Sequence, residues 1–124
     1  MTPFGAQVRA LRRAHGVTLK KMAAELQISE AYLSALEHGR RGRPTQNLVQ
    51  QICGYFNIIW DEAEALEHLA RLSHPRVIVD TAGLSPKATE LANRLAESIA
   101  GVGEDDLEKM LQALDAATGA GSKE

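Results

Sequence analysis

Three arginines stand close together between residues 39 and 44, in the sequence Gly-Arg-Arg-Gly-Arg-Pro. Each guanidinium carries a planar fork of hydrogen-bond donors that matches the oxygens of a phosphate. The two glycines allow the loop to follow a nucleic-acid strand closely. We therefore predict that Arg40, Arg41 and Arg43 bind backbone phosphates, with an ordinary flexible basic loop as the alternative interpretation.

Other kinds of chemistry find little support in the sequence. The four histidines are scattered, and no serine or cysteine belongs to a recognisable nucleophile–histidine–acid pattern. With one cysteine, no intramolecular disulfide can form, and Cys53 is expected to be a small core residue rather than a redox sensor. We predict no enzyme activity, no metal site and no cofactor.

The charge distribution places the positive charge in the same part of the chain as this loop. The net charge of the 124 residues is −2, but residues 1–45 contain eight Lys or Arg against three Asp or Glu. Residues 77–124 contain four Lys or Arg against nine Asp or Glu. Because the local field steers a polyanion, the N-terminal part is suited to nucleic acid. Two oppositely charged solvated ends are the alternative interpretation.

The loop follows a stretch, residues 18–39, that predicts two short helices joined by a tight turn. Apolar side chains recur at helical spacing in each half. They are Leu19, Met22, Ala23 and Leu26 in the first helix, and Tyr32, Leu33 and Leu36 in the second. Thr18 and Ser29 are suitable N-caps, and Gly39 can end the second helix with a positive φ. This layout is typical of a helix-turn-helix, whose second helix enters the major groove of DNA.

The stretch resembles the lambda repressor-like, Cro/Xre-type family of DNA-binding domains, and the resemblance extends from the first helix to about Leu72. The matching residues are Val17, Thr18, Ala23, Leu26, Ile28, Ser29, Tyr32, Leu33, Ser34, Leu36, Glu37 and Gly39. The sequence departs from the family at Leu19, where Gln is usual, and at Gln27, where the turn usually has Gly. It departs again at Glu30, where Arg or Gln is common.

The helix-turn-helix layout assigns two sets of DNA contacts. Residues on the outer side of the second helix are predicted to read base edges: Ser29, Glu30, Ala31, Ser34 and Ala35. A serine can hydrogen-bond a base, an alanine can meet a thymine methyl group, and a glutamate can accept from a cytosine amino group. Phosphate contacts are predicted for Thr18, Lys20, Tyr32 and His38, in addition to Arg40, Arg41 and Arg43.

A first helix is expected to precede this pair within a domain of residues 1–74. Thr2 and Pro3 predict its start, because a capping hydroxyl is followed by proline at the first helical position, and it ends near His15. Its inward residues are expected to be Val8 and Leu11, with Phe4 as a third candidate. Its arginines, which are expected to face water or phosphate, are Arg9, Arg12 and Arg13.

Two further helices are expected to complete five in this domain. Thr45 is expected to cap the fourth helix, and the fifth is expected over residues 61–73. The inward residues predicted for the fifth are Leu66, Leu69, Ala70 and Leu72. Trp60 is expected, with Ile58 and Ile59, to close the bottom of the bundle as a core residue, and to be an interface candidate only in second place.

The remaining residues predict a linker over 75–84, an amphipathic helical hairpin over 85–118 and a disordered tail over 119–124. Residues 77–79 have strand character, so the linker is either extended or paired with its copy in a second subunit. The apolar side of the hairpin is formed by Leu91, Leu95, Ile99, Leu107, Leu111 and Leu114. Because so small a hairpin cannot bury this side alone, we expect it to form a dimer or to pack on the first domain.

Together these patterns predict an all-α protein, with a five-helix lambda repressor-like domain followed by a helical hairpin. The expected function is that of a sequence-specific regulator of transcription, with repression as the expected sign. It would bind double-stranded DNA as a homodimer on a two-fold symmetric operator. The alternative is a helix-turn-helix antitoxin or interaction module that binds a protein partner through its C-terminal extension. No signal peptide or membrane-spanning run is recognisable, so a cytoplasmic location is expected.

Overall fold

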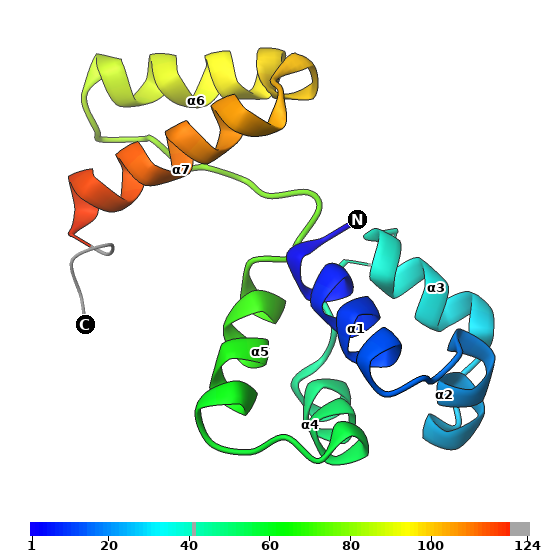
Figure 1. The fold of residues 1–124 in the computed structure, drawn as a ribbon. Coiled ribbons are helices and arrows are strands. Elements are labelled where there is room, and N and C mark those ends of the chain that lie inside the picture. Colours follow the sequence, from blue (N-terminus) through cyan, green and yellow to red (C-terminus); the bar gives the residue numbers. More distant parts are fainter. Residues whose placement is uncertain (41, 120–124) are drawn as a thin grey trace. The chain divides into compact units, whose positions relative to one another are not determined.

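The computed structural model describes residues 1–40 and 42–119, which divide into two compact units, one of Met1–Val77 and one that begins at Ile78. The first unit contains α1 Pro3–Ala14, α2 Leu19–Leu26, α3 Glu30–His38, α4 Gln46–Phe56 and α5 Asp61–Arg71 (Figure 1). The second contains α6 Pro86–Ser98, the short 3-10 helix η1 Ile99–Gly101 and α7 Glu104–Thr118. All regular structure in the described residues is helical, which confirms the all-α prediction.

The first four helices each begin directly after a hydroxyl side chain that caps them. Thr2 accepts a hydrogen bond from the backbone N–H of Gly5, and Thr18, Ser29 and Thr45 accept equivalent bonds three residues ahead. Each bond satisfies one of the backbone donors that a helix leaves without an internal partner. The predicted caps are therefore confirmed, and so is Pro3 as the first helical residue.

The turn between α2 and α3 bends the chain at a residue with left-handed backbone. Gln27 has φ 62° and ψ 41°, in the position where the resembled family usually has glycine. The backbone N–H of Ile28 then bonds the carbonyl of Ala23 at 3.0 Å, and the Ile28 side chain packs against the core. Gly39, with φ 79°, ends α3 as predicted. These two left-handed residues fix where α2 and α3 end.

A single hydrophobic core connects the five helices of the first unit. Its buried members are Phe4, Val8, Met22, Ala23, Leu33, Leu36, Leu48, Val49, Ile52, Cys53, Phe56, Leu66 and Ala70. Helices α1 and α3 approach closely at Gly5, where an added Cβ would lie 2.0 Å from the backbone oxygen of Glu37. The two backbones therefore pack directly against one another, which allows no side chain at residue 5.

Three expected core positions are wrong. Trp60 is 80% exposed and Ile59 is 62% exposed, whereas Ile58 alone of the three packs against the core. Trp60 lies at the N-cap of α5 with φ 58°, and this backbone conformation directs its side chain away from the bundle. Leu72 is also exposed, because α5 ends at Arg71 and Leu72 follows the last helical turn.

The second unit is a pair of amphipathic helices with no buried residue in either α6 or α7. Ser85 caps α6, and η1 with Gly103 separates it from α7, as the glycine pattern predicted.

The described segments outside these helices have no regular structure. Residues 77–79, whose composition is typical of a strand, form no strand and are instead an exposed extended segment. Residues 120–124 of the predicted tail lie outside the described residues, and Gly119 ends α7 with φ 78°. No described helix is both long enough and apolar enough to cross a membrane.

Candidate nucleic-acid interface

The predicted base-reading residues share one helix and differ in exposure. Ser29, Glu30 and Ala31, at the start of α3, are exposed, while Ser34 and Ala35 are half-buried one turn later. The opposite side of α3 is anchored in the core, where Leu33 and Leu36 are at most 2% exposed. The N-terminal turn of α3 is therefore the part of the helix with most surface available to a ligand.

Capping leaves the hydroxyls of Ser29 and Thr18 able to donate. Ser29 Oγ accepts from the Tyr32 N–H at 3.0 Å, and Thr18 Oγ1 accepts from the Lys21 N–H at 3.1 Å. A hydroxyl has one donor hydrogen besides its acceptor lone pairs, so each group can still donate to a phosphate or base oxygen. Both residues can thus cap a helix and still make the predicted contact with DNA.

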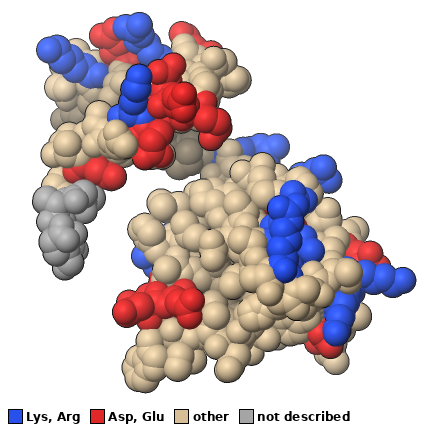
Figure 2. Space-filling view, viewed as in Figure 1, with Lys and Arg blue, Asp and Glu red and all other residues tan. Residues whose placement is uncertain are grey.

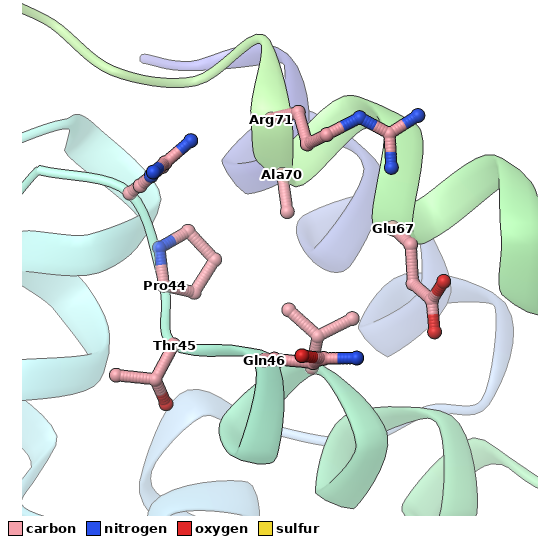
Figure 3. Close-up of a pocket in the computed structure, with 8 residues that line it drawn as sticks. Pro44, Thr45, Gln46, Glu67, Ala70 and Arg71 are labelled. Atoms are coloured by element: carbon pink, nitrogen blue, oxygen red, sulfur yellow. The ribbon is translucent and has the colours of Figure 1, made fainter.

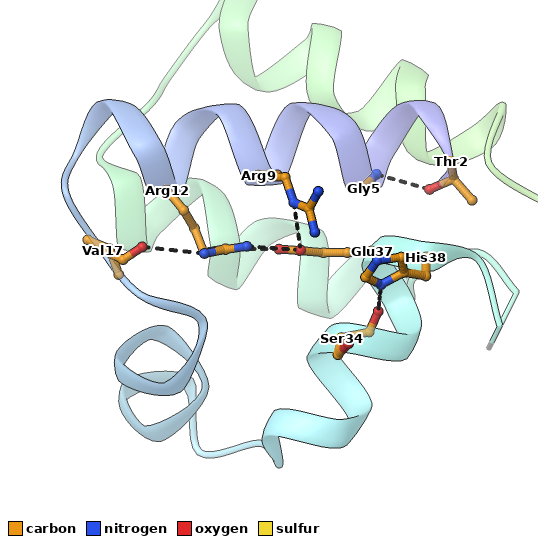
Figure 4. Close-up of polar contacts among 8 residues, drawn as sticks. All are labelled: Thr2, Gly5, Arg9, Arg12, Val17, Ser34, Glu37 and His38. Atoms are coloured by element: carbon orange, nitrogen blue, oxygen red, sulfur yellow. Dashed lines mark hydrogen bonds and ion pairs between the residues drawn. The ribbon is translucent and has the colours of Figure 1, made fainter.

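The remaining predicted phosphate ligands lie around α3 in different settings. Lys20 is exposed, whereas Tyr32 is half-buried and packs against the core. His38 is exposed, and its Nδ1 lies 2.8 Å from the carbonyl oxygen of Ser34 (Figure 4). Because a carbonyl only accepts, Nδ1 must carry the hydrogen, and Nε2 of the neutral ring is then an acceptor.

A buried ion pair fixes α3 against α1. Arg12 donates from Nε and from its second guanidinium nitrogen to the two carboxylate oxygens of Glu37, at 3.0 Å each, and Arg9 Nε lies 3.9 Å away (Figure 4). The side chains of Arg12 and Glu37 are 12% and 2% exposed. Arg12 also lies 3.5 Å from the Val17 carbonyl oxygen, which it can bond.

This pair corrects the expectation that Arg12 faces water or phosphate. Its guanidinium is engaged by a buried carboxylate, so Arg12 holds α3 against α1 instead of facing water. The spacing of apolar residues in the sequence could have predicted this pair. Arg12 comes four residues after buried Val8, and Glu37 four residues after buried Leu33, so both charges lie on inward helix faces.

The basic loop leaves α3 and leads into α4. Arg40 and Arg43 are exposed, and Arg41 lies outside the described residues. The Arg40 N–H bonds the Ala35 carbonyl at 2.8 Å, and Gly42 has φ 85°, so this loop bends at glycines on both sides of Arg40 and Arg41. Arg40 therefore lies at the C-terminal end of α3, and Arg43 lies shortly before the start of α4.

Arg43 also lines an open pocket of about 380 Å³ between the start of α4 and α5. Figure 3 shows Arg71, on α5, over the same pocket as Thr45 and Gln46, with Glu67 one turn away. Sequence reasoning did not single out Arg71. It lies beyond the helix-turn-helix in the chain, and only the packing of α5 against α4 brings it near Arg43.

A hydrogen bond from Tyr55 to Glu25 joins the end of α4 to α2. This bond to the Glu25 carboxylate, together with partial burial and the carboxylate charge, raises the pKa of Tyr55 to about 12. Nearby on α4, burial and the neighbouring Glu67 raise the pKa of the Cys53 thiol. A thiol held protonated in a core is a poor nucleophile, which agrees with a structural role for Cys53.

The acidic side chains of the second unit are grouped on its surface, as Figure 2 shows. Three of them, Glu104, Asp105 and Asp106, open α7. Acidic residues outnumber basic ones in this unit, so the first unit, with its excess of Lys and Arg over residues 1–45, is better suited to attract a polyanion. Within the described residues, no group of three or more His, Cys, Asp or Glu is placed to hold a metal ion.

Comparison with known proteins identifies the family. The profile of the helix-turn-helix domain family matches residues 3–66 of the 124. The chain belongs to the helix-turn-helix family. This confirms the family predicted from residues 17–39.

Similar individual proteins include one curated sequence and one solved structure. The chain is 34% identical over 65 residues to the uncharacterized HTH-type transcriptional regulator RghRB of Bacillus subtilis (strain 168). The match covers 52% of this chain and 47% of that protein, so the chain spans about half the length of this relative. A chain of the SinR–SinI protein complex is 16% identical, with a TM-score of 0.45 over 94% of this chain and 98% of that chain.

Proposed function

We propose that the protein is a sequence-specific DNA-binding regulator of transcription. The observation that supports this most is that α3 is buried on one side and exposed at its N-terminal turn. Its inner face is held by Leu33, Leu36 and the buried Glu37, while its first turn is exposed and its end adjoins the basic loop. A rigidly held helix with a free N-terminal turn is what direct readout in a major groove requires.

In the proposed mechanism, phosphate contacts set the register and base contacts give the sequence preference. Arg40, Arg41 and Arg43 neutralise phosphates, and helix α3 then places Glu30 against the base edges. A glutamate accepts well from cytosine and repels base edges that present acceptors. Ser29 and Ser34 donate to bases or phosphates, and Ala31 and Ala35 contact thymine methyl groups.

We further propose that the protein acts as a homodimer through its second unit. The apolar side chains predicted for this role are exposed or half-buried within the unit, at Leu91, Leu95, Ile99, Leu107, Leu111 and Leu114. Two copies of such a surface cover one another, and the resulting two-fold protein matches two operator half-sites.

A second candidate function rests on the same exposed surface. The apolar side of α6 and α7, bordered by carboxylates, would equally suit a separate protein partner that the second unit neutralises or recruits. In that case the first unit would keep the helix-turn-helix fold as a scaffold or as a secondary DNA-binding site.

Selection of binding sites from a random DNA pool, followed by affinity measurements at several salt concentrations, tests the proposal. We expect a two-fold symmetric site and a slope of log K against log salt near −5, which corresponds to about six phosphates at about −0.9 each. The Arg40→Ala/Arg41→Ala/Arg43→Ala variant should flatten the slope. A matched control, Lys87→Ala/Arg94→Ala/Lys109→Ala, removes as much charge from the second unit and should leave the slope unchanged. Weak binding without any motif would contradict the proposal.

A further inference from the structure

Two large apolar side chains, which are consecutive in the chain, are exposed at the corner between α4 and α5. Trp60 is 80% exposed and Ile59 is 62% exposed, although both stand between the buried residues Phe56 and Leu66 in the chain. The proposed DNA interface, on α3 and the basic loop, uses neither of them. An exposed tryptophan beside a second apolar residue is typical of a protein contact surface.

An apolar groove adjoins this corner. It has a volume of about 180 Å³ and lies between α1 and α5, with Leu11, Ile58 and Leu69 among its lining residues and Glu62 at its edge. Ile58 and Glu62 directly flank the exposed segment Ile59 to Asp61 in the chain. We use the name Trp60 corner for the exposed residues Ile59, Trp60, Asp61 and Glu64 together with the groove that begins at their chain neighbours Ile58 and Glu62.

The Trp60 corner is acidic. Asp61, Glu62 and Glu64 occupy the first turn of α5, all three are exposed, and none forms an ion pair with another described residue. Figure 2 shows a compact group of acidic side chains on the first unit, over the region of α5 in Figure 1. Favourable interaction with the helix dipole accounts for the carboxylates, but it does not account for the exposed Trp60.

These charges decide which partner the corner fits. A second copy of the corner would bring like charges together, and the second unit, with nine Asp or Glu against four Lys or Arg over residues 77–124, is acidic as well. Like charges facing one another across an interface oppose binding. The complementary partner is therefore positively charged and lies outside the acidic parts of this chain.

We propose that the Trp60 corner is a docking surface for a basic, amphipathic segment of another protein. Apolar side chains of that segment enter the groove between α1 and α5 and cover Ile59 and Trp60. Its Lys or Arg side chains pair with Asp61, Glu62 and Glu64, and one of them stacks on the face of the indole. The proposal does not depend on DNA binding, because it uses a separate surface.

The fluorescence of Trp60 reports on this contact directly, since it is the one tryptophan of the chain. The probe is a synthetic helical peptide with leucines along one face and arginines along the other, added to the full-length protein. We expect a saturable blue shift of the emission that weakens as salt is added. The same peptide with glutamate in place of arginine should produce no shift. A basic peptide that binds only to the acidic second unit would leave the emission unchanged and would overturn the proposal.

Two variants keep Trp60 as the reporter and separate the corner from the rest of the surface. Glu62→Lys/Glu64→Lys should weaken peptide binding by about tenfold or more, since two exposed ion pairs are replaced by repulsion. Leu72→Ser, at the other end of α5, should bind as the unchanged protein does, and circular dichroism should show both variants folded. Equal binding by the charge-reversed variant overturns the proposal. So does a blue shift that grows with protein concentration alone, because a second copy would then cover the corner.

Discussion

The Glu37 carboxylate on α3 receives both of its short hydrogen bonds from one guanidinium, that of Arg12 on α1, at 3.0 Å each. Glu37 is 2% exposed, so the carboxylate is satisfied by the protein and not by water. The backbone carbonyl of the same residue lies against Gly5 and accepts from the Thr2 N–H at 3.4 Å. Residue 37 thus joins the recognition helix to the first helix through both its side chain and its backbone.

Removal of Arg12 should be strongly destabilising. Arg12→Ala leaves a buried carboxylate without its partner, and we expect a loss of about 3–5 kcal/mol in the free energy of unfolding, measured by urea denaturation. Arg13→Ala, at the exposed neighbouring position, should change it by less than about 0.5 kcal/mol. The double variant Arg12→Met/Glu37→Leu should recover much of the stability. A single variant as stable as the unchanged protein would show that the pair is not formed.

Replacement of two helical glycines by alanine should change the free energy of unfolding in opposite directions. Gly5→Ala places a Cβ 2.0 Å from the backbone oxygen of Glu37 and should cost about 1–3 kcal/mol or more, because α1 must move away from α3. Gly54→Ala, on the open side of α4 with no atom within 4 Å of its Cβ, should add about 0.5–1 kcal/mol. Thermal unfolding of both variants measures the contrast, and a neutral Gly5→Ala would refute the close approach.

The hydrogen bond between Tyr55 and Glu25 should be visible in a pH titration. The pKa of Tyr55 is raised to about 12 from its ordinary value of 10, so the folded state holds the phenol proton more tightly than the unfolded state does. The resulting stabilisation is complete below pH 10 and is lost as the pH rises from 10 to 12. Ultraviolet titration should show one late tyrosinate, and Glu25→Gln should move it to lower pH. Two tyrosines that both ionise normally would contradict the bond.

Local sequence signals predicted the helices well, because capping and periodicity depend on neighbouring residues. Thr2, Thr18, Ser29 and Thr45 each identified the start of a helix, and Gly39 identified an end. Gln27 ends a helix in the same left-handed conformation as Gly39, with φ 62°, although it is not a glycine. The outward residues of α3 followed from the inward ones by helical geometry.

The errors come from features that depend on the whole bundle. The apolar run of Ile58, Ile59 and Trp60 predicted a buried Trp60, but the left-handed backbone at that residue turns the indole outward. A charged residue on an inward helix face was interpreted as solvated, although the partner of Arg12 lies 25 residues away. Arg71 joins Arg43 at one pocket only through the packing of α5 on α4. Spacing within one helix cannot reveal such contacts.

Base specificity should change at one position when Glu30 is replaced. Glu30→Gln exchanges a pure acceptor for a group that also donates, so it should shift the preference from cytosine towards adenine at one base pair of each half-site, by about 1–3 kcal/mol. Lys20→Ala should instead weaken binding to all sequences alike. Competition binding with single-base operator variants measures both effects. Uniform weakening by Glu30→Gln would remove Glu30 from the base-reading set.

Dimerisation through the second unit should be sensitive to charge on its apolar side. Leu91→Asp/Leu111→Asp places carboxylates on α6 and α7 where burial between two copies would strip them of water, which opposes association. Sedimentation should then show a monomer, and affinity for a paired operator should fall to that for a single half-site. Ile78→Asp, at a position that is 92% exposed in the extended segment, is the matched control and should remain dimeric. If the double variant still sediments as a dimer, the second unit does not form the dimer, and its apolar side is then available to a separate protein partner.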